Sequence, residues 1–216
     1  SVASGVAQLG LTTALIEKAK MGGDCLNTGC VPSKSLIAAA KNAHAFRSSK
    51  KFGITPQEPE IDFSAVKNHV DDVIAQIAPH DSQERFEKLG VTVFREEAKF
   101  IDTRSLQVGD DVIEAKYFVI ATGSRPNIPK ITGLDENKIL TNETIFDLSN
   151  KPKHLVIIGG GPIGIEMAQA HRRLGSEVTV IDTGHILSHD DKEIVDILRG
   201  ILKDEGINIF ENAIIQ

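Results

Sequence analysis

A glycine-rich turn between an apolar strand and a helix is the feature that most restricts how this chain can fold. Residues 154–158 predict a short strand, and the run GGGPIG at residues 159–164 follows it. A predicted helix extends to Leu174, and Asp182 follows Gly164 by 18 residues, after a second apolar run. Such glycines allow a tight turn and close approach of a pyrophosphate to the helix N-terminus, and the acid binds ribose hydroxyls. The segment therefore predicts a dinucleotide site. The alternative is a glycine turn that binds no phosphate.

Part of this pattern occurs twice. Residues 7–17 and residues 172–182 both contain a helix end, a Leu-Gly stop, a β-rich strand and an acid, and they are 165 positions apart. Glycine is a common signal for the end of a helix. We expect a first glycine loop that precedes Ser1, with Glu17 binding the ribose of a first nucleotide. The predicted fold is α/β, with two Rossmann-like dinucleotide-binding domains: the first lacks its first strand and the second is incomplete.

The only two cysteines, Cys25 and Cys30, lie in the run GGDCLNTGCVPSK at residues 22–34. In a regular helix, their spacing would put the Cα atoms ~8 Å apart, whereas a disulfide needs roughly 4.4–6.8 Å. We therefore expect Cys25 on an irregular approach to a helix and Cys30 in its first turn. The positive end of that helix, and Lys34 one turn beyond Cys30, would stabilise a thiolate.

This setting favours a redox-active pair over three alternatives. A structural disulfide is unexpected because no secretion signal is visible, and a short-loop bridge adds little to a chain of 216 residues. A zinc site would favour tighter cysteine spacing and needs four ligands, so no metal site is predicted. Two unrelated buried thiols are the third alternative.

Composition excludes several classes of function. The net charge is −6, there is no Trp and there is one Tyr, so nothing indicates a nucleic-acid partner. No stretch is long and apolar enough to span a membrane, and no signal-peptide pattern begins at Ser1. We expect a cytoplasmic protein that does not bind membranes.

These motifs together resemble the pyridine nucleotide-disulfide oxidoreductases, the flavoenzyme group of dihydrolipoamide dehydrogenase, glutathione reductase and mercuric reductase. The resemblance rests on residues 22–34, on the run ATGSRP at residues 121–126, and on residues 159–166, and it covers essentially the whole chain. It implies an enzyme that moves electrons between NAD(P)H, FAD and a Cys25–Cys30 redox disulfide.

The resemblance also implies roles for single residues. Cys25 would be the interchange thiol that meets the substrate, and Cys30 would lie against the flavin as a charge-transfer thiolate. Lys34 would pair with Glu166 beside the flavin. The cofactor-binding positions would be Glu17, Gly23, Lys34, Thr122 and Gly123 for FAD, and Gly159, Gly161, Gly164 and Asp182 for the nicotinamide dinucleotide.

Several positions depart from the family pattern. Pro162 stands where glutathione reductases carry a Tyr, so a Tyr gate over the nicotinamide site is absent. NADP-dependent relatives carry Arg at the positions of Asp182 and Ser188. Because a carboxylate would repel a 2′-phosphate, we expect NAD rather than NADP. Asp24 stands where Thr is commoner in the family, and no function is assigned to it.

Residues 1–150 are expected to form the FAD-binding domain with the redox disulfide, and residues 151–216 to begin the NAD(P)-binding domain, with residues 125–153 as the connection. Asp190 is expected to cap a helix over residues 192–199 rather than to bind metal with His185 and His189. The other predicted elements are a helical region over residues 61–89 with a kink at Pro79, a surface helix segment at residues 80–82, and strands at residues 91–100, 105–108, 112–115, 117–121 and 207–210.

We expect a dihydrolipoamide dehydrogenase-like activity first, with a mercuric reductase-like activity as the alternative. A non-catalytic nucleotide-binding fragment is the rival from another class. The expected partners are a small disulfide, dithiol or metal-ion substrate and a second copy of the chain, since members of the family are homodimers. Their catalytic His–Glu pair comes from a C-terminal domain that lies outside this sequence.

Overall fold

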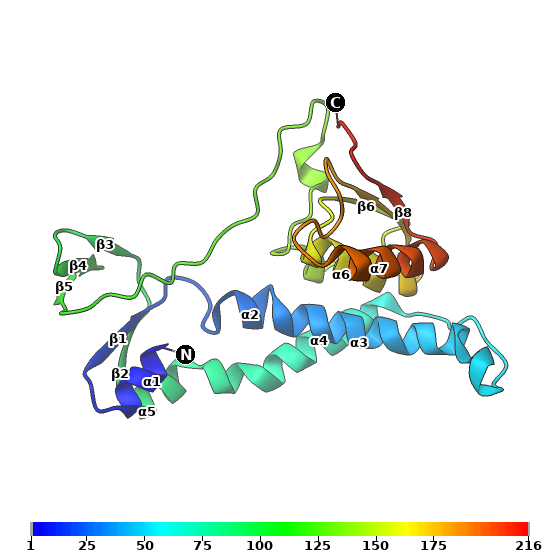
Figure 1. Ribbon diagram of the computed structural model, residues 1–216. Helices are drawn as coiled ribbons and strands as arrows, with labels where there is room; N and C mark the ends of the chain where they lie inside the picture. The colour runs from blue at the N-terminus through cyan, green and yellow to red at the C-terminus, as the bar shows by residue number, and fades with distance from the viewer. Residues whose placement is uncertain (1, 216) are drawn as a thin grey trace. The chain divides into compact units, whose positions relative to one another are not determined.

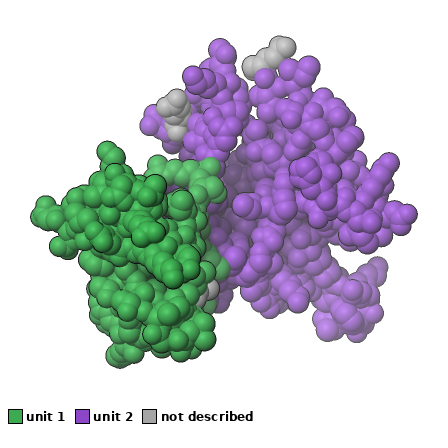
Figure 2. Space-filling view, turned by 60° about the vertical axis from the view of Figure 1, so that its left-hand side comes forward, with its two compact units in different colours: residues 1–27, 74–125 green, residues 28–73, 126–216 purple. Residues whose placement is uncertain are grey.

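The computed structural model describes residues 2–215. The chain divides into two compact units, coloured separately in Figure 2. Unit 1 comprises residues 1–27 and 74–125, and unit 2 comprises residues 28–73 and 126–216. The domains expected from the sequence, residues 1–150 and 151–216, concern which segment binds which cofactor, and that assignment stays a prediction.

Helices and strands alternate along much of the chain, which confirms the predicted α/β class (Figure 1). The α-helices are α1 (Val2–Gln8), α2 (Gly23–Asn27), α3 (Cys30–Arg47), α4 (Phe63–Ile77), α5 (Gln83–Lys88), α6 (Pro162–Arg173) and α7 (Lys192–Asp204). The 3-10 helices are η1 (Ser49–Phe52), η2 (Ala78–Asp81), η3 (Glu136–Lys138) and η4 (Ile145–Asp147). The strands are β1 (Thr13–Ile16), β2 (Val91–Phe94), β3 (Ala98–Phe100), β4 (Ser105–Val108), β5 (Asp111–Glu114), β6 (His154–Ile158), β7 (Glu177–Ile181) and β8 (Asn208–Phe210).

Unit 1 contains two small sheets. β1 and β2 pair in parallel, and β3, β4 and β5 form an antiparallel sheet in that order. α1 ends before Gly10, which has a φ of +81° and leads into β1, as the Leu-Gly stop predicted. The strand predicted over residues 91–100 is therefore two strands, β2 and β3, which belong to different sheets.

Unit 2 is built on a parallel sheet with the order β6-β7-β8. α6 connects β6 to β7 and α7 connects β7 to β8, and Figure 1 shows both helices on one face of the sheet. Their apolar sides pack on that face, where Ala168, Val180 and Leu202 are fully buried. The opposite face carries the exposed side chains of Val156 and Ile158. This strand–helix–strand order confirms the Rossmann-like pattern predicted from the glycine loop.

α3 packs against α6 within unit 2. Arg47, the last residue of α3, donates from Nε to both carboxylate oxygens of Glu58 at 2.8 and 2.9 Å, and from Nη1 to the carbonyl of Arg173 at the end of α6. The helix that begins at Cys30 is therefore fixed to the helix that begins at the glycine loop.

The strand predicted over residues 117–121 does not form. This segment has no strand partner in the part of the chain that the structure describes, and the side chains of Tyr117, Val119 and Ile120 are 80%, 66% and 75% exposed. An apolar run has the composition of a buried strand, but a strand also needs a neighbour that completes its hydrogen bonds. The prediction was therefore wrong for this structure.

Three local predictions need correction. Cys25 lies inside α2 rather than on an irregular approach, because the chain turns at Gly22, with a φ of +90°, directly into a helical turn that buries Leu26. Asp191, not Asp190, caps α7: its side chain accepts hydrogen bonds from the backbone N–H of Glu193 at 2.9 Å. α7 also continues beyond residue 199 to Asp204.

The helical region over residues 61–89 agrees with its prediction in outline. α4 ends at Ile77, η2 contains Pro79, and α5 begins again after Ser82, whose side chain accepts a hydrogen bond from the N–H of Arg85. Proline removes a backbone donor and ends the regular helix at this point. β8 is the strand predicted over residues 207–210.

The core of unit 2 contains a histidine. His171 on α6 is 0% exposed, its Nδ1 donates to the carbonyl of Met167 at 3.0 Å, and its Nε2 has no partner among the described residues. Burial lowers the pKa of His171, and the hydrogen bond to Met167 opposes this effect only in part. The side chain is therefore neutral in the folded protein.

We expect His171 to destabilise the protein in mild acid. The unfolded His titrates near about 6.5 and the folded one lower, so below about pH 6.5 the unfolded state binds more protons. The free energy of unfolding should then fall by up to about 1.4 kcal/mol per pH unit. His171→Gln should reduce this slope, measured by urea unfolding across the range, whereas His189→Gln, at an exposed position, should leave it unchanged. An unaltered slope in His171→Gln would contradict the expectation.

Candidate functional site

The glycine loop of unit 2 joins β6 to α6. Gly159 has a φ of +106°, a region that favours glycine, and its N–H donates to the carbonyl of Ile181 at 2.8 Å. A Cβ at Gly164 would lie 2.2 Å from the carbonyl oxygen of Gly159, and one at Gly160 would lie 2.5 Å from Cγ2 of Ile186. The fold itself therefore requires glycine at residues 159, 160 and 164.

Gly161 differs from these three glycines. A Cβ added there would meet nothing within 4 Å, and its φ of −73° suits any residue. It is the N-cap of α6, whose first turn begins with Pro162 and holds no acidic side chain. Helix N-termini attract anions through their unpaired N–H groups and the helix dipole. Open space at this backbone leaves room for the pyrophosphate that the sequence predicts.

Asp182 follows β7 at the same edge of the sheet. Its half-buried carboxylate accepts hydrogen bonds from Gly160 N–H at 2.6 Å and from Gly184 N–H at 2.7 Å. The predicted ribose-binding acid thus also joins the glycine loop to the loop after β7. Each carboxylate oxygen can accept a further hydrogen bond, so ribose binding is compatible with this position.

Cys30 is the first residue of α3 and is exposed. The first turn of α3 contains no acidic residue, and the helix dipole is positive at this end. Cys25 is exposed on α2, in unit 1, where the side-chain amide of Asn27 donates to the carbonyls of Met21 and Gly23 and shapes the turn.

Lys34 and Glu166 form an ion pair between α3 and α6. Lys34 Nζ lies 2.6 Å from each carboxylate oxygen of Glu166, and the side chains are 59% and 38% exposed. A groove of about 330 Å³ between the two helices is lined by both residues, together with Gln169 and Arg173. The structure therefore brings together two of the four predicted catalytic residues, one turn from Cys30.

The predicted FAD-binding residues of unit 1 lie on separate segments. Glu17 directly follows β1, and its side chain accepts a hydrogen bond from Ala19 N–H at 2.8 Å. Thr122 and Gly123 lie on an exposed extended segment, and a Cβ at Gly123 would lie 3.3 Å from Oδ2 of Asp24. Gly23 has a φ of +58° and open space around its Cα.

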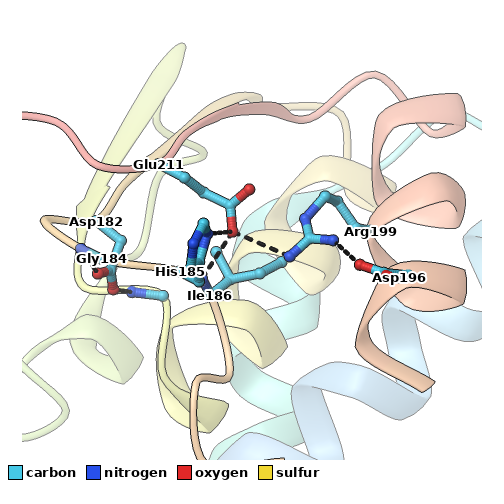
Figure 3. Close-up of polar contacts among 8 residues, drawn as sticks. Asp182, Gly184, His185, Ile186, Asp196, Arg199 and Glu211 are labelled. Atoms are coloured by element: carbon cyan, nitrogen blue, oxygen red, sulfur yellow. Dashed lines mark hydrogen bonds and ion pairs between the residues drawn. The ribbon is translucent and has the colours of Figure 1, made fainter. Parts of the chain in front are cut away.

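Sequence reasoning missed a cluster at the end of β8, drawn in Figure 3. Glu211 follows the last residue of β8 and lies between the N–H of Ile186 and the guanidinium of Arg199. The signal was available, since Glu211 follows an apolar strand just as Asp182 does. No group of three or more His, Cys, Asp or Glu residues that could hold a metal occurs among residues 2–215. In the same part of the chain, no helix is long and apolar enough to cross a membrane.

Solved structures support this architecture. The HOCl-induced flavoprotein disulfide reductase RclA from Escherichia coli matches with a TM-score of 0.83 and 28% sequence identity, over 99% of this chain and 46% of that protein. Because the match covers almost the whole chain, it supports the predicted fold class.

Curated relatives agree with the structural match. A mercuric reductase from Streptomyces lividans is 36% identical over 93% of this chain, and a dihydrolipoyl dehydrogenase from Geobacillus stearothermophilus is 35% identical over 96%. The chain spans 44% and 45% of the lengths of these two relatives. The family profile described as pyridine nucleotide-disulphide oxidoreductase matches residues 1–216. The chain therefore belongs to the pyridine nucleotide-disulphide oxidoreductases, a family of FAD-dependent enzymes that use NAD(P)H.

Proposed function

We propose that the protein moves electron pairs between NADH, FAD and a Cys25–Cys30 disulfide. The observation that carries this proposal is the Lys34–Glu166 ion pair, which connects the helix that begins at Cys30 with the helix that begins at the glycine loop. In the reductase direction, NADH becomes NAD⁺ by giving up a hydride, which carries two electrons and one proton. The sulfur–sulfur bond breaks, and these two electrons and this proton leave one thiol and one thiolate. When bound, FAD supplies the step between hydride and disulfide chemistry.

The residues of this chain would bind and orient the cofactors. Gly161 and the N-terminus of α6 would hold the pyrophosphate, and Asp182 would accept ribose hydroxyls. The positive end of α3 and the nearby Lys34 ammonium would stabilise negative charge on Cys30. The FAD contacts are proposed at Glu17, Gly23, Lys34, Thr122 and Gly123.

We propose NAD as the nicotinamide cofactor. Asp182 presents a carboxylate where a 2′-phosphate would lie, and Ser188 offers no compensating cation. The first-choice activity is dihydrolipoamide dehydrogenase-like, and mercuric reductase-like is the alternative. The two named relatives differ by one percentage point in identity, so similarity does not rank these activities. A cytoplasmic homodimer remains part of the proposal, on the family resemblance alone.

Anaerobic titration of the purified protein with NADH tests the relay. We expect a yellow protein that gains a long-wavelength absorption band on reduction, because Cys30 would place a thiolate against the flavin. Cys30→Ser should lose the band. Cys25→Ser should show the band before NADH is added, because Cys30 then has no disulfide partner and needs no reduction to present its sulfur to the flavin. A protein that stays colourless after FAD is added would contradict the enzyme proposal and favour a non-catalytic nucleotide-binding protein.

Alanine at two glycines should separate ligand binding from folding. Gly161→Ala should still fold, with a loss of stability of at most about 1 kcal/mol because Ala is a poorer N-cap than Gly, yet bind NADH at least about tenfold more weakly, because its methyl group occupies the proposed approach of the pyrophosphate. Gly164→Ala should weaken binding and also destabilise the protein, since its Cβ overlaps Gly159. Gly200→Ala, on an exposed part of α7, is the control for NADH affinity, which it should leave unchanged, although alanine in a helix interior should raise the thermal stability. Equilibrium binding and thermal unfolding measure both effects, and normal NADH affinity in Gly161→Ala would exclude this pyrophosphate position.

A further inference from the structure

The loop between β7 and α7 covers one side of the glycine loop. Ile186 is 1% exposed and packs on Gly160, where no Cβ could be accommodated. The N–H of Leu187 donates to the carbonyl of Gly160 at 2.9 Å. Asp182, at the start of this loop, accepts from the N–H of Gly160. The position of residues 182–187 therefore determines the shape of the glycine loop.

Glu211 holds this loop from the other side. Its Oε1 accepts a hydrogen bond from Ile186 N–H at 3.0 Å, lies 3.1 Å from Nη2 of Arg199 and lies 3.4 Å from Nδ1 of His185 (Figure 3). The Glu211 side chain is 18% exposed. Arg199 also pairs with Asp196, an exposed residue three positions earlier on α7.

The backbone after Glu211 continues these contacts. Asn212 N–H donates to the carbonyl of Gly184 at 2.9 Å, and Ala213 N–H donates to the carbonyl of Asp182 at 3.0 Å. Leu187 and Asn212, with φ values of 49° and 52°, are the non-glycine residues with positive φ among those described. Asn adopts this conformation comparatively easily, but for Leu187 it is uncommon, and strained backbone positions cluster at functional sites.

The charge of Glu211 is maintained despite its partial burial. Burial acts to raise the pKa of Glu211, but the hydrogen bond from Ile186 N–H and the charge of Arg199 outweigh burial, and the pKa lies below its ordinary value. Glu211 is thus ionised at neutral pH, so its carboxylate can accept the Ile186 N–H and pair with Arg199 at the same time.

We propose that Glu211 is a positioning residue for dinucleotide binding. By holding the N–H of Ile186, it keeps the loop against Gly160, so that Asp182 and the glycine loop are ordered before the dinucleotide arrives. Ordering a site in advance improves affinity because binding no longer bears the cost of ordering it. The proposal rests on the dinucleotide site proposed above, and it predicts an effect on affinity for NADH rather than on the chemical step.

Four variants of the flavin-loaded protein test this role. Glu211→Gln keeps the length and an acceptor oxygen, whereas Glu211→Asp keeps the charge but withdraws the oxygen from Ile186. We expect Glu211→Asp and Glu211→Ala to weaken NAD⁺ binding, measured calorimetrically, by about 5- to 30-fold, and Glu211→Gln by less than about threefold. The KM for NADH should rise in parallel while kcat stays unchanged. Asp196→Asn, which removes the other partner of Arg199, is the matched control and should leave affinity unchanged.

The outcomes separate the two proposals. If the unsubstituted protein binds no NAD⁺, the proposed function fails and the role of Glu211 fails with it. If it binds NAD⁺ and Glu211→Asp and Glu211→Ala bind it equally well, only the role of Glu211 is overturned. Loss of affinity in Glu211→Gln with retention in Glu211→Asp would also overturn it, because charge rather than the bond to Ile186 would then matter. If Glu211→Ala fails to fold, the NAD⁺ affinities of Glu211→Gln and Glu211→Asp still test the role of Glu211.

Discussion

The candidate dinucleotide site depends on the carboxylate of Asp182, which holds two backbone segments at once through Gly160 and Gly184. In the proposed site, the same carboxylate would also present the negative charge that opposes a 2′-phosphate. One side chain therefore both orders the backbone of this site and supplies its negative charge. A basic residue at position 182 would remove the repulsion but would also leave two backbone N–H groups without their acceptor, so a change of cofactor preference at this position should affect the loop as well.

The connection between α3, which begins at Cys30, and α6, which follows the glycine loop, has a different physical basis. Lys34 and Glu166 are largely solvent-exposed, and such pairs contribute about 0–1 kcal/mol to stability. Their ion pair is therefore a weak reason for α3 and α6 to associate. The buried side chains along α3 and the hydrogen bond from Arg47 to the end of α6 hold the helices together. Packing thus fixes the helices, and the ion pair sets where a positive charge lies relative to Cys30.

The glycine loop, Asp182, the Lys34–Glu166 pair and most helices could be predicted, because each rests on a local pattern or on the family resemblance. The errors have a common cause. Residues 117–121 have the composition of a strand, but composition does not reveal whether a pairing partner is present. Asp190 and Asp191 are equally good caps in sequence, and only the backbone decides which one precedes the helix. Glu211 follows an apolar strand as Asp182 does, but this position does not reveal that its partner is the N–H of Ile186, 25 residues away.

The glycines of the loop show how fold and ligand requirements can be distinguished within one motif. Gly159, Gly160 and Gly164 are explained by backbone conformation or by contacts within the protein, whereas no contact among residues 2–215 requires glycine at residue 161. An unexplained glycine at a helix N-terminus is informative because another residue would cap the helix better: Asn, Asp and Ser are favoured at this position. The pyrophosphate proposed to bind here would account for the smaller residue, because it would approach this backbone from outside the chain. The N-terminus of α6 would attract this anion, and Asp182 would hold the ribose of the same proposed dinucleotide.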